Sequence, residues 1–225
     1  MFTEAFLFDL DGTLTDSDPL HFAAFAETAR GYGVDMDEEM FVKKVSGQTN
    51  ANICKTLFTH IEPEEHARIA DEKEELFRQM IVGKLKPIPG VVDLMKWAKA
   101  RGCGFALVSN APRANITDML AELGIAGLFD IIVCASELPR GKPDPLPYLT
   151  GLELLGVKAN RAVAFEDAAP GLTAAHRAGI ATVGLTTSLS PEALLGFGAD
   201  IAVQDYTDPK LRAFVETALS GNFSR

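Results

Sequence analysis

The sequence has few cysteines and few basic residues, and each shortage excludes a class of protein. Its three cysteines, Cys54, Cys103 and Cys134, lie far apart and form no Cys-x-x-Cys pair. We therefore expect a reducing compartment, with neither a disulfide framework nor a zinc site. Lysine and arginine number 21 against 31 aspartates and glutamates, which gives a formal net charge of -10. This balance argues against a nucleic-acid-binding surface or a polybasic membrane face.

Long apolar runs are also missing. No stretch approaches the length that a membrane-spanning helix needs. Glu4 interrupts the start of the chain, so we expect no signal peptide. The remaining composition, 47% hydrophobic and 23% charged, is ordinary for a globular protein. We predict a cytoplasmic protein without nucleic-acid or membrane partners, built as one large domain or as a domain with a smaller insertion.

One stretch near the start of the chain combines a strand with an acidic turn. Residues 6–8 form a short apolar run typical of a buried parallel strand, and Asp9 and Asp11 follow it directly. Gly12 then allows a sharp turn and a close approach of the backbone to a ligand. Carboxylates at the carboxyl end of a strand lie where open α/β sheets bind ligands. The alternative is that Asp-Gly here is ordinary turn chemistry.

A helical block separates this first strand from the next one. Residues 18–85 show helical periodicity and contain no convincing strand. A block of this length, placed between two strands, is typical of an inserted cap. The predicted domains are a core of residues 1–16 and 87–225 and a cap of residues 17–86.

Strands and helices alternate after the block. Apolar runs predict strands at 104–108, 131–134, 162–165, 181–184 and 201–203. Segments with helical periodicity lie between most of them. This alternation implies right-handed crossovers and therefore an α/β fold, a doubly wound parallel sheet with helices on both faces.

Polar residues near the ends of the later strands complete a possible site. Ser109 and Asn110 can hold phosphoryl oxygens through a hydroxyl and backbone N–H groups, with an ordinary helix cap as the alternative. Lys142 lies between a glycine and a proline, and it can stabilise charge on a phosphate or a nucleophilic carboxylate. Glu166 and Asp167 suit Mg²⁺, which prefers carboxylate oxygens. Their alternative role is an acidic pair at a helix N-terminus.

These residues, in this order, resemble the motifs of the haloacid dehalogenase superfamily: Asp9-x-Asp11-Gly12-Thr13, Ser109, Lys142 and Glu166-Asp167. The helical block resembles the small helical cap of that superfamily, and the likeness covers nearly the whole chain. The most similar subgroup contains β-phosphoglucomutase, phosphoglycolate phosphatase and the sugar-phosphate phosphatases. Dehalogenase members lack an acid at the Asp11 position, so its presence favours phosphoryl transfer.

The resemblance implies a role for each residue of the motifs. Asp9 would be the nucleophile that forms an aspartyl-phosphate. Asp11 would protonate the leaving alcohol and then deprotonate the attacking water. Thr13 and Ser109 would hold phosphoryl oxygens, with Asn110 beside them through its backbone.

The resemblance also implies a Mg²⁺ cofactor. The Asp9 carboxylate, the backbone carbonyl of Asp11 and the Asp167 carboxylate would bind the metal, with Glu166 on or near it through water. Lys142 would pair with the phosphoryl group and with Asp9. The dication and the ammonium together would remove the repulsion between two anions that must approach each other.

The helical block carries the residues that the resemblance connects with substrate choice. Gly47, Gln48 and Thr49 lie in a segment similar to a specificity loop, with a plain helix–helix connection as the alternative. By alignment, Thr49 occupies the position of a mutase arginine that grips a second phosphate, and this difference argues against a mutase. Lys73 and His21 match a mutase lysine and histidine, although many phosphatases of the subgroup share the histidine.

We therefore predict a phosphatase of small phosphorylated metabolites, either sugar phosphates or phosphoglycolate-like compounds. We expect a monomer or a weak homodimer. An enclosing cap argues against phosphoproteins and nucleic acids as substrates. The alternative enzyme is a β-phosphoglucomutase-like phosphomutase. A non-catalytic binding protein with the same fold is a third hypothesis, which the complete set of motif residues disfavours.

Overall fold

The computed structural model describes residues 2–45 and 49–221. The chain forms two compact units. The first, here called the core unit, consists of Met1–Asp16 and Lys86–Arg225, and the second, the helical unit, consists of Ser17–Leu85. The core unit is thus interrupted after its first strand and resumes about seventy residues later.

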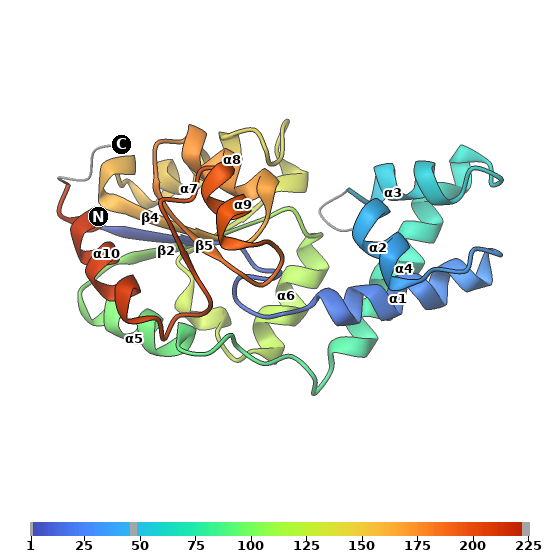
Figure 1. Cartoon of the computed structure of the whole chain (residues 1–225), viewed down its shortest axis with the longest axis horizontal. Coiled ribbons are helices and arrows are strands. Elements are labelled where there is room, and N and C mark those ends of the chain that lie inside the picture. The colour runs from blue at the N-terminus through green and yellow to red at the C-terminus, as the bar shows by residue number, and fades with distance from the viewer. Residues whose placement is uncertain (1, 46–48, 222–225) are drawn as a thin grey trace. The chain divides into compact units, whose positions relative to one another are not determined.

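The core unit is built on a sheet of six parallel strands in the order β3-β2-β1-β4-β5-β6 (Figure 1). The strands are β1 Ala5–Phe8, β2 Gly104–Ser109, β3 Ile131–Cys134, β4 Ala162–Glu166, β5 Ala181–Leu185 and β6 Ile201–Val203. β1 lies in the middle, and the register pairs Phe8 with Leu107 of β2 and Phe165 of β4. This order arises because the helical connections between the parallel strands pass over both faces of the sheet. The predicted doubly wound α/β fold is confirmed.

Helices connect the strands and cover both faces of the sheet. They are α5 Val91–Ala100, α6 Arg113–Glu122, α7 Leu146–Leu155, α8 Ala169–Arg177, α9 Pro191–Gly196 and α10 Pro209–Leu219. Single 3₁₀ turns occur at Ala126–Leu128, Ala135–Glu137 and Ala159–Arg161. In Figure 1, α7 and α8 lie on one side of the sheet, and α5 and α10 lie on the other.

α9 is not among the predicted helices, although its start carries a local signal. Ser190 precedes Pro191, and the Ser190 hydroxyl accepts a hydrogen bond from the Ala193 N–H. Serine at the N-cap followed by proline at the first helical position is typical of a helix start. The short length of α9 leaves little apolar periodicity to reveal it.

Two different sets of side chains pack on the two faces of the sheet. Leu7 of β1 and the fully buried Tyr148 of α7 belong to a cluster that is otherwise rich in alanine, leucine and valine. The opposite face is aromatic: Phe8 and Phe165 stack with ring centroids 4.7 Å apart, and Tyr206 lies 5.5 Å from Phe165. Successive residues of a strand point to opposite faces, so a continuous apolar run fills both layers. The strands that carry the site are thus buried on both sides.

The helical unit has a core of its own. Its α-helices within the described residues are α1 Asp18–Gly31, α2 Glu38–Lys44, α3 Asn50–Leu57 and α4 His66–Ile81. Their apolar faces enclose a cluster that includes Phe25, Ile53 and Ile69. The longest of these helices, α4, begins at His66, directly after a 3₁₀ turn at Pro63–Glu65. Such turns are frequent at helix N-termini.

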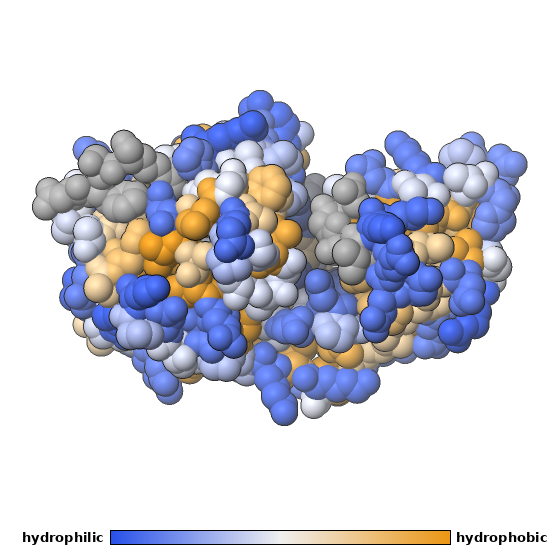
Figure 2. Space-filling model, in the orientation of Figure 1, coloured by the Kyte–Doolittle hydropathy of each residue, from blue (hydrophilic) through white to orange (hydrophobic). Residues whose placement is uncertain are grey.

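On the face drawn in Figure 2, hydrophilic side chains cover most of the helical unit, and hydrophobic ones gather over part of the core unit. Exposed large hydrophobic side chains include Val82, Leu149, Leu154, Leu195 and Phe197. Across residues 2–45 and 49–221, the structure contains no helix with the length and apolar character of a membrane span.

Candidate active site

The carboxyl ends of β1, β2 and β4 meet at one edge of the sheet and carry predicted motif residues. Asp9 directly follows β1, Ser109 is the last residue of β2, and Glu166 is the last residue of β4. The Asp9 N–H donates to the Phe165 carbonyl at 3.0 Å, so the sheet's hydrogen bonding continues for one residue before the chain turns. Because neighbouring parallel strands end side by side, residues far apart in the sequence converge here.

Lys142 supplies the positive charge of this site. Its Nζ lies 2.6 Å from Asp9 Oδ1 and 2.6 Å from Glu166 Oε1. The Lys142 backbone N–H donates to the Asn110 side chain at 3.3 Å, which connects the lysine loop to the residue after β2. Burial alone would lower the pKa of Lys142, but the two carboxylates raise this pKa above its usual value. The lysine therefore stays an ammonium.

Three carboxylates gather beside this ammonium. Asp9, Glu166 and Asp167 each offer an oxygen, and these oxygens lie within 4.8 Å of one another. Burial raises the pKa of Asp9 to about 7; Lys142 opposes this shift, and Glu166 and Asp11 add to it. The cluster thus has an excess of negative charge and offers only oxygen ligands. Mg²⁺ prefers such a ligand set. The residues present fit the predicted metal.

Two glycines allow the backbone to approach these carboxylates closely. Gly12 has a φ of +70°, and a Cβ added there would lie 2.1 Å from Asp167 Oδ2. A Cβ added to Gly171 of α8 would lie 2.0 Å from Glu166 Oε1. Any larger residue at either position would displace a carboxylate, so both glycines help to set the carboxylate orientation.

The other two residues of the first motif lie next to the acidic cluster. The Asp11 side chain is outside the three-acid cluster found among the described residues, but its charge contributes to the raised pKa of Asp9. The Thr13 hydroxyl donates to Asp167 Oδ1 at 3.3 Å. The first motif is therefore in contact with the fourth through Thr13, a relationship that the sequence did not predict.

The alternative interpretations of the motifs as helix caps are not supported. Ser109 is 1% exposed, and its hydroxyl oxygen accepts a hydrogen bond from the Ala111 N–H at 3.0 Å. The N-cap of α6 is Pro112, without a side-chain hydrogen bond, so neither Ser109 nor Asn110 caps that helix. The first turn of α8 contains no acidic residue, so neither Glu166 nor Asp167 lies in that turn.

The predicted substrate residues of the helical unit form a network within that unit. Lys73 is 2% exposed, and its Nζ lies 3.1 Å from His21 Nδ1 and 3.0 Å from Glu74 Oε1. The same ammonium lies 4.2 Å from the centre of the Phe25 ring. Asn50 donates to Glu74 Oε1 at 2.7 Å. The charge of Lys73 is therefore compensated inside the helical unit.

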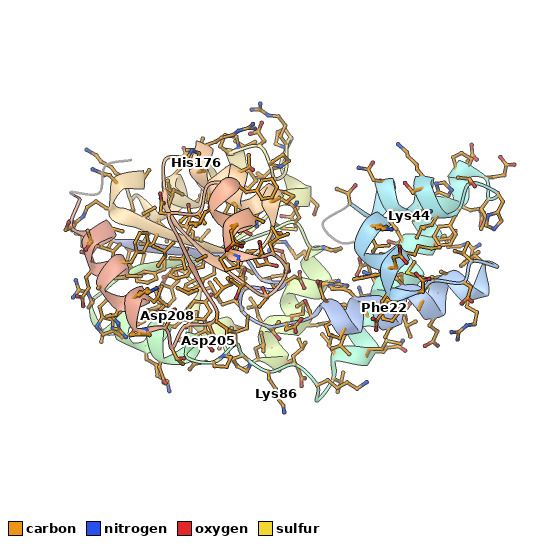
Figure 3. All side chains as sticks on the ribbon, in the orientation of Figure 1. Phe22, Lys44, Lys86, His176, Asp205 and Asp208 are labelled. Atoms are coloured by element: carbon orange, nitrogen blue, oxygen red, sulfur yellow. The ribbon has the colours of Figure 1, made fainter. Side chains whose placement is uncertain are left out.

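The predicted specificity loop is described only from Thr49 onward, because Gly47 and Gln48 lie outside the described residues. Thr49 is the N-cap of α3, and its hydroxyl oxygen accepts a hydrogen bond from the Asn52 N–H at 3.4 Å. Lys44, a lysine close to this loop in the sequence, is exposed at the end of α2 (Figure 3). Thr49 therefore stabilises the start of α3 as its N-cap residue.

Tyr148 and Ser188, which were not predicted from the sequence, donate hydrogen bonds to carboxylates of the site. The fully buried Tyr148 donates its hydroxyl to Glu166 Oε1 at 2.5 Å, and burial raises the pKa of this tyrosine well above its usual value. The Ser188 hydroxyl donates to Asp167 Oδ2. In the sequence, Tyr148 has apolar neighbours, as core aromatic residues commonly do. Ser188 lies in a polar run that is typical of a loop. Neither sequence pattern carries a specific signal.

Comparisons with known proteins agree with this geometry. The profile of the haloacid dehalogenase-like hydrolases matches residues 6–185. The chain belongs to this family. A phosphorylated carbohydrates phosphatase of Thermotoga maritima is 32% identical over 203 residues, which cover 87% of this chain and 92% of the relative. A β-phosphoglucomutase of Bacillus subtilis is 29% identical over 221 residues, which cover 95% of this chain and 94% of that protein.

A solved structure extends the agreement to the fold. The haloacid dehalogenase-type hydrolase of Entamoeba histolytica (family IA, variant 3) superposes with a TM-score of 0.86 at 27% identity, over 96% of this chain and 99% of that one. The predicted superfamily and enzyme class, a haloacid dehalogenase-type hydrolase of phosphoric monoesters, are confirmed at the level of the family.

Proposed function

We propose that this haloacid dehalogenase-type enzyme is a Mg²⁺-dependent phosphatase of small phosphorylated metabolites, either sugar phosphates or phosphoglycolate-like compounds. The contact of Lys142 with Asp9, beside the cluster of Asp9, Glu166 and Asp167, is the observation that carries the proposal. A carboxylate nucleophile beside a fixed ammonium suits attack on a phosphate ester, because the ammonium offsets the repulsion between two anions. The phosphatase from Thermotoga maritima supports phosphorylated carbohydrates as a substrate class.

The reaction would take place in two steps. An Asp9 carboxylate oxygen attacks phosphorus, the new O–P bond forms as the ester O–P bond breaks, and Asp11 gives its proton to the leaving oxygen. Water then attacks the aspartyl-phosphate, and Asp11 takes a proton from that water, so that inorganic phosphate leaves and Asp9 is restored. Lys142 and the groups at Thr13 and Ser109 would hold the phosphoryl oxygens throughout.

The same residues would hold Mg²⁺. Asp9, Asp167 and the backbone carbonyl of Asp11 are the proposed ligands, with Glu166 on or near the metal through water. The indirect role suits Glu166, because its Oε1 already accepts a hydrogen bond from Lys142. Bound Mg²⁺ would neutralise charge on the phosphate and polarise its oxygens. The excess negative charge of the cluster supports the assignment.

We assign substrate selection to the helical unit. Lys73, His21 and Thr49 are the described residues that we propose for this role, and the predicted loop residues Gly47 and Gln48 precede Thr49 in the sequence. The buried network around Lys73 supports a fixed polar group rather than a mobile surface charge.

A β-phosphoglucomutase-like phosphomutase is the second candidate. The similarity to the Bacillus subtilis enzyme over 95% of the chain favours it. The two activities share the phosphorylated aspartate and differ in the acceptor, which is water in the phosphatase and a sugar hydroxyl in the mutase. Thr49 favours the phosphatase, because it carries no charge for a second phosphate group.

Phosphate release from a panel of small esters tests the proposal. The panel contains phosphoglycolate, hexose 6-phosphates and β-glucose 1-phosphate, each with Mg²⁺, with EDTA, and with Mg²⁺ restored after EDTA. We expect metal-dependent phosphate release with a preference for one class of ester. Formation of glucose 6-phosphate from β-glucose 1-phosphate with little free phosphate would favour the mutase. No turnover of any ester would overturn both proposals.

A further inference from the structure

The connection that follows β5 makes two contacts with the active site. The Thr187 hydroxyl donates to the Gly12 carbonyl at 2.6 Å, and the Ser188 hydroxyl donates to Asp167 Oδ2. Both residues are exposed, whereas Asp167 is only 4% exposed. A surface loop therefore places two consecutive hydroxyl groups against the first and fourth motifs.

These contacts restrict the orientation of the Asp167 carboxylate. Oδ2 accepts a hydrogen bond from Ser188, and Oδ1 accepts one from Thr13 at 3.3 Å. Gly12 lies so close that even a Cβ there would come within 2.1 Å of Oδ2. With a donor on each oxygen and backbone beside it, rotation of this carboxylate about χ2 would break at least one hydrogen bond.

Orientation of this carboxylate bears on metal binding. Groups that hydrogen-bond to a metal-ligating side chain fix its direction and reduce the cost of arranging it around the ion. Hydrogen bonds to an ionised carboxylate are also stronger than those between neutral groups. Ser188 contributes such a bond from an element that none of the motif residues belongs to.

We propose that Ser188 is a positioning residue for the metal site: its hydroxyl holds Asp167 in the orientation that binds Mg²⁺. Thr187 supports it by fixing the loop to the Gly12 carbonyl. This inference rests on the proposed Mg²⁺-dependent function. Ser188 touches the carboxylate and is assigned no contact with substrate.

Mg²⁺ binding to metal-free protein, measured by isothermal titration calorimetry, tests the inference without turnover. Loss of a group that orients a metal ligand typically weakens metal binding about 10- to 100-fold, so we expect Ser188→Ala to raise the Kd for Mg²⁺ by about tenfold or more. Ser188→Thr keeps the hydroxyl and should restore an affinity near that of the wild type. Ser220→Ala removes an exposed hydroxyl that donates to the Thr217 carbonyl and should leave the affinity unchanged.

A kinetic measurement separates positioning from a general structural role. The Mg²⁺ concentration for half-maximal activity should rise in Ser188→Ala, whereas kcat at saturating Mg²⁺ should stay close to the wild-type value. Equal Mg²⁺ affinity in Ser188→Ala and wild type would overturn the inference and leave the proposed function intact. Tighter binding in Ser188→Ala would also overturn it, because the hydroxyl would then compete with the ion. Wild-type protein that binds no Mg²⁺ would overturn the metal dependence itself.

Discussion

The ammonium of Lys142 lies 2.6 Å from a carboxylate oxygen of Asp9, although 133 residues separate the two in the sequence. The same Nζ lies 2.6 Å from Glu166, so one buried cation serves two acids from different strand ends. The pKa of Asp9 nevertheless remains raised, because burial and the neighbouring acids outweigh the lysine. The site is therefore short of positive charge, as a site for a metal ion and an anionic substrate requires.

Asp9→Asn tests the nucleophile. An amide cannot form the phosphorylated intermediate, so we expect phosphate release to fall at least ~10³-fold. The variant has nearly the same side-chain shape and loses a buried charge, so its circular dichroism spectrum and thermal unfolding should match a folded protein. Activity within tenfold of the wild type would contradict the assignment.

Asp11→Asn tests the acid and base. A positioned proton donor and acceptor typically contributes about 10²- to 10⁴-fold to a rate, and we expect a loss of that size in kcat. Esters with good leaving groups, such as p-nitrophenyl phosphate, need little help from an acid in the first step. The loss should therefore be smaller for that ester than for a sugar phosphate when the first step limits the rate. Near-normal turnover of both esters would remove Asp11 from the mechanism.

Lys142→Met tests the buried cation. Removing it leaves Asp9 and Glu166 without their shared partner, and breaking a buried ion pair typically costs about 3–5 kcal/mol in the free energy of unfolding. Urea unfolding in EDTA should show this loss, and phosphate release should fall about 10²-fold or more.

Lys99→Met is the matched control for that lysine. Lys99 also lies 2.6 Å from a carboxylate, that of Asp130, but both side chains are about 30% exposed. An exposed pair is worth about 1 kcal/mol or less. Equal losses of stability in the two variants would contradict a special role for the buried Lys142.

Tyr148→Phe tests the hydroxyl that donates to Glu166. The ring remains to fill the core, and the variant loses only a buried hydrogen bond to a charged group, typically worth about 1.5–3 kcal/mol. We expect a lower free energy of unfolding and a modest loss of kcat, because Glu166 would be less well oriented toward Lys142. Tyr32→Phe removes a hydroxyl that donates to Glu72 at the surface and should change the stability much less. Wild-type stability in Tyr148→Phe would mean that the buried hydroxyl contributes nothing.

The sequence by itself determined the parallel sheet and the positions of the main site residues. Continuous apolar runs ending in Asp9, Ser109 and Glu166 carry this information locally. Parallel strands must bring their carboxyl ends to one edge, so residues at those ends predict a shared site without any knowledge of contacts. The start of α9 at Ser190 also carried a local signal, and a six-residue helix has too little periodicity to strengthen it.

Only the tertiary structure decided which side chains of the site contact one another. The two partners of Lys142, the Tyr148 hydroxyl on Glu166 and the Ser188 hydroxyl on Asp167 join segments that are distant in the sequence. Each depends on the packing of a helix or loop against the strand ends, and no periodicity or spacing encodes such a contact. A hydroxyl has the same local sequence pattern whether it faces water or a buried carboxylate, because tertiary packing determines its partner.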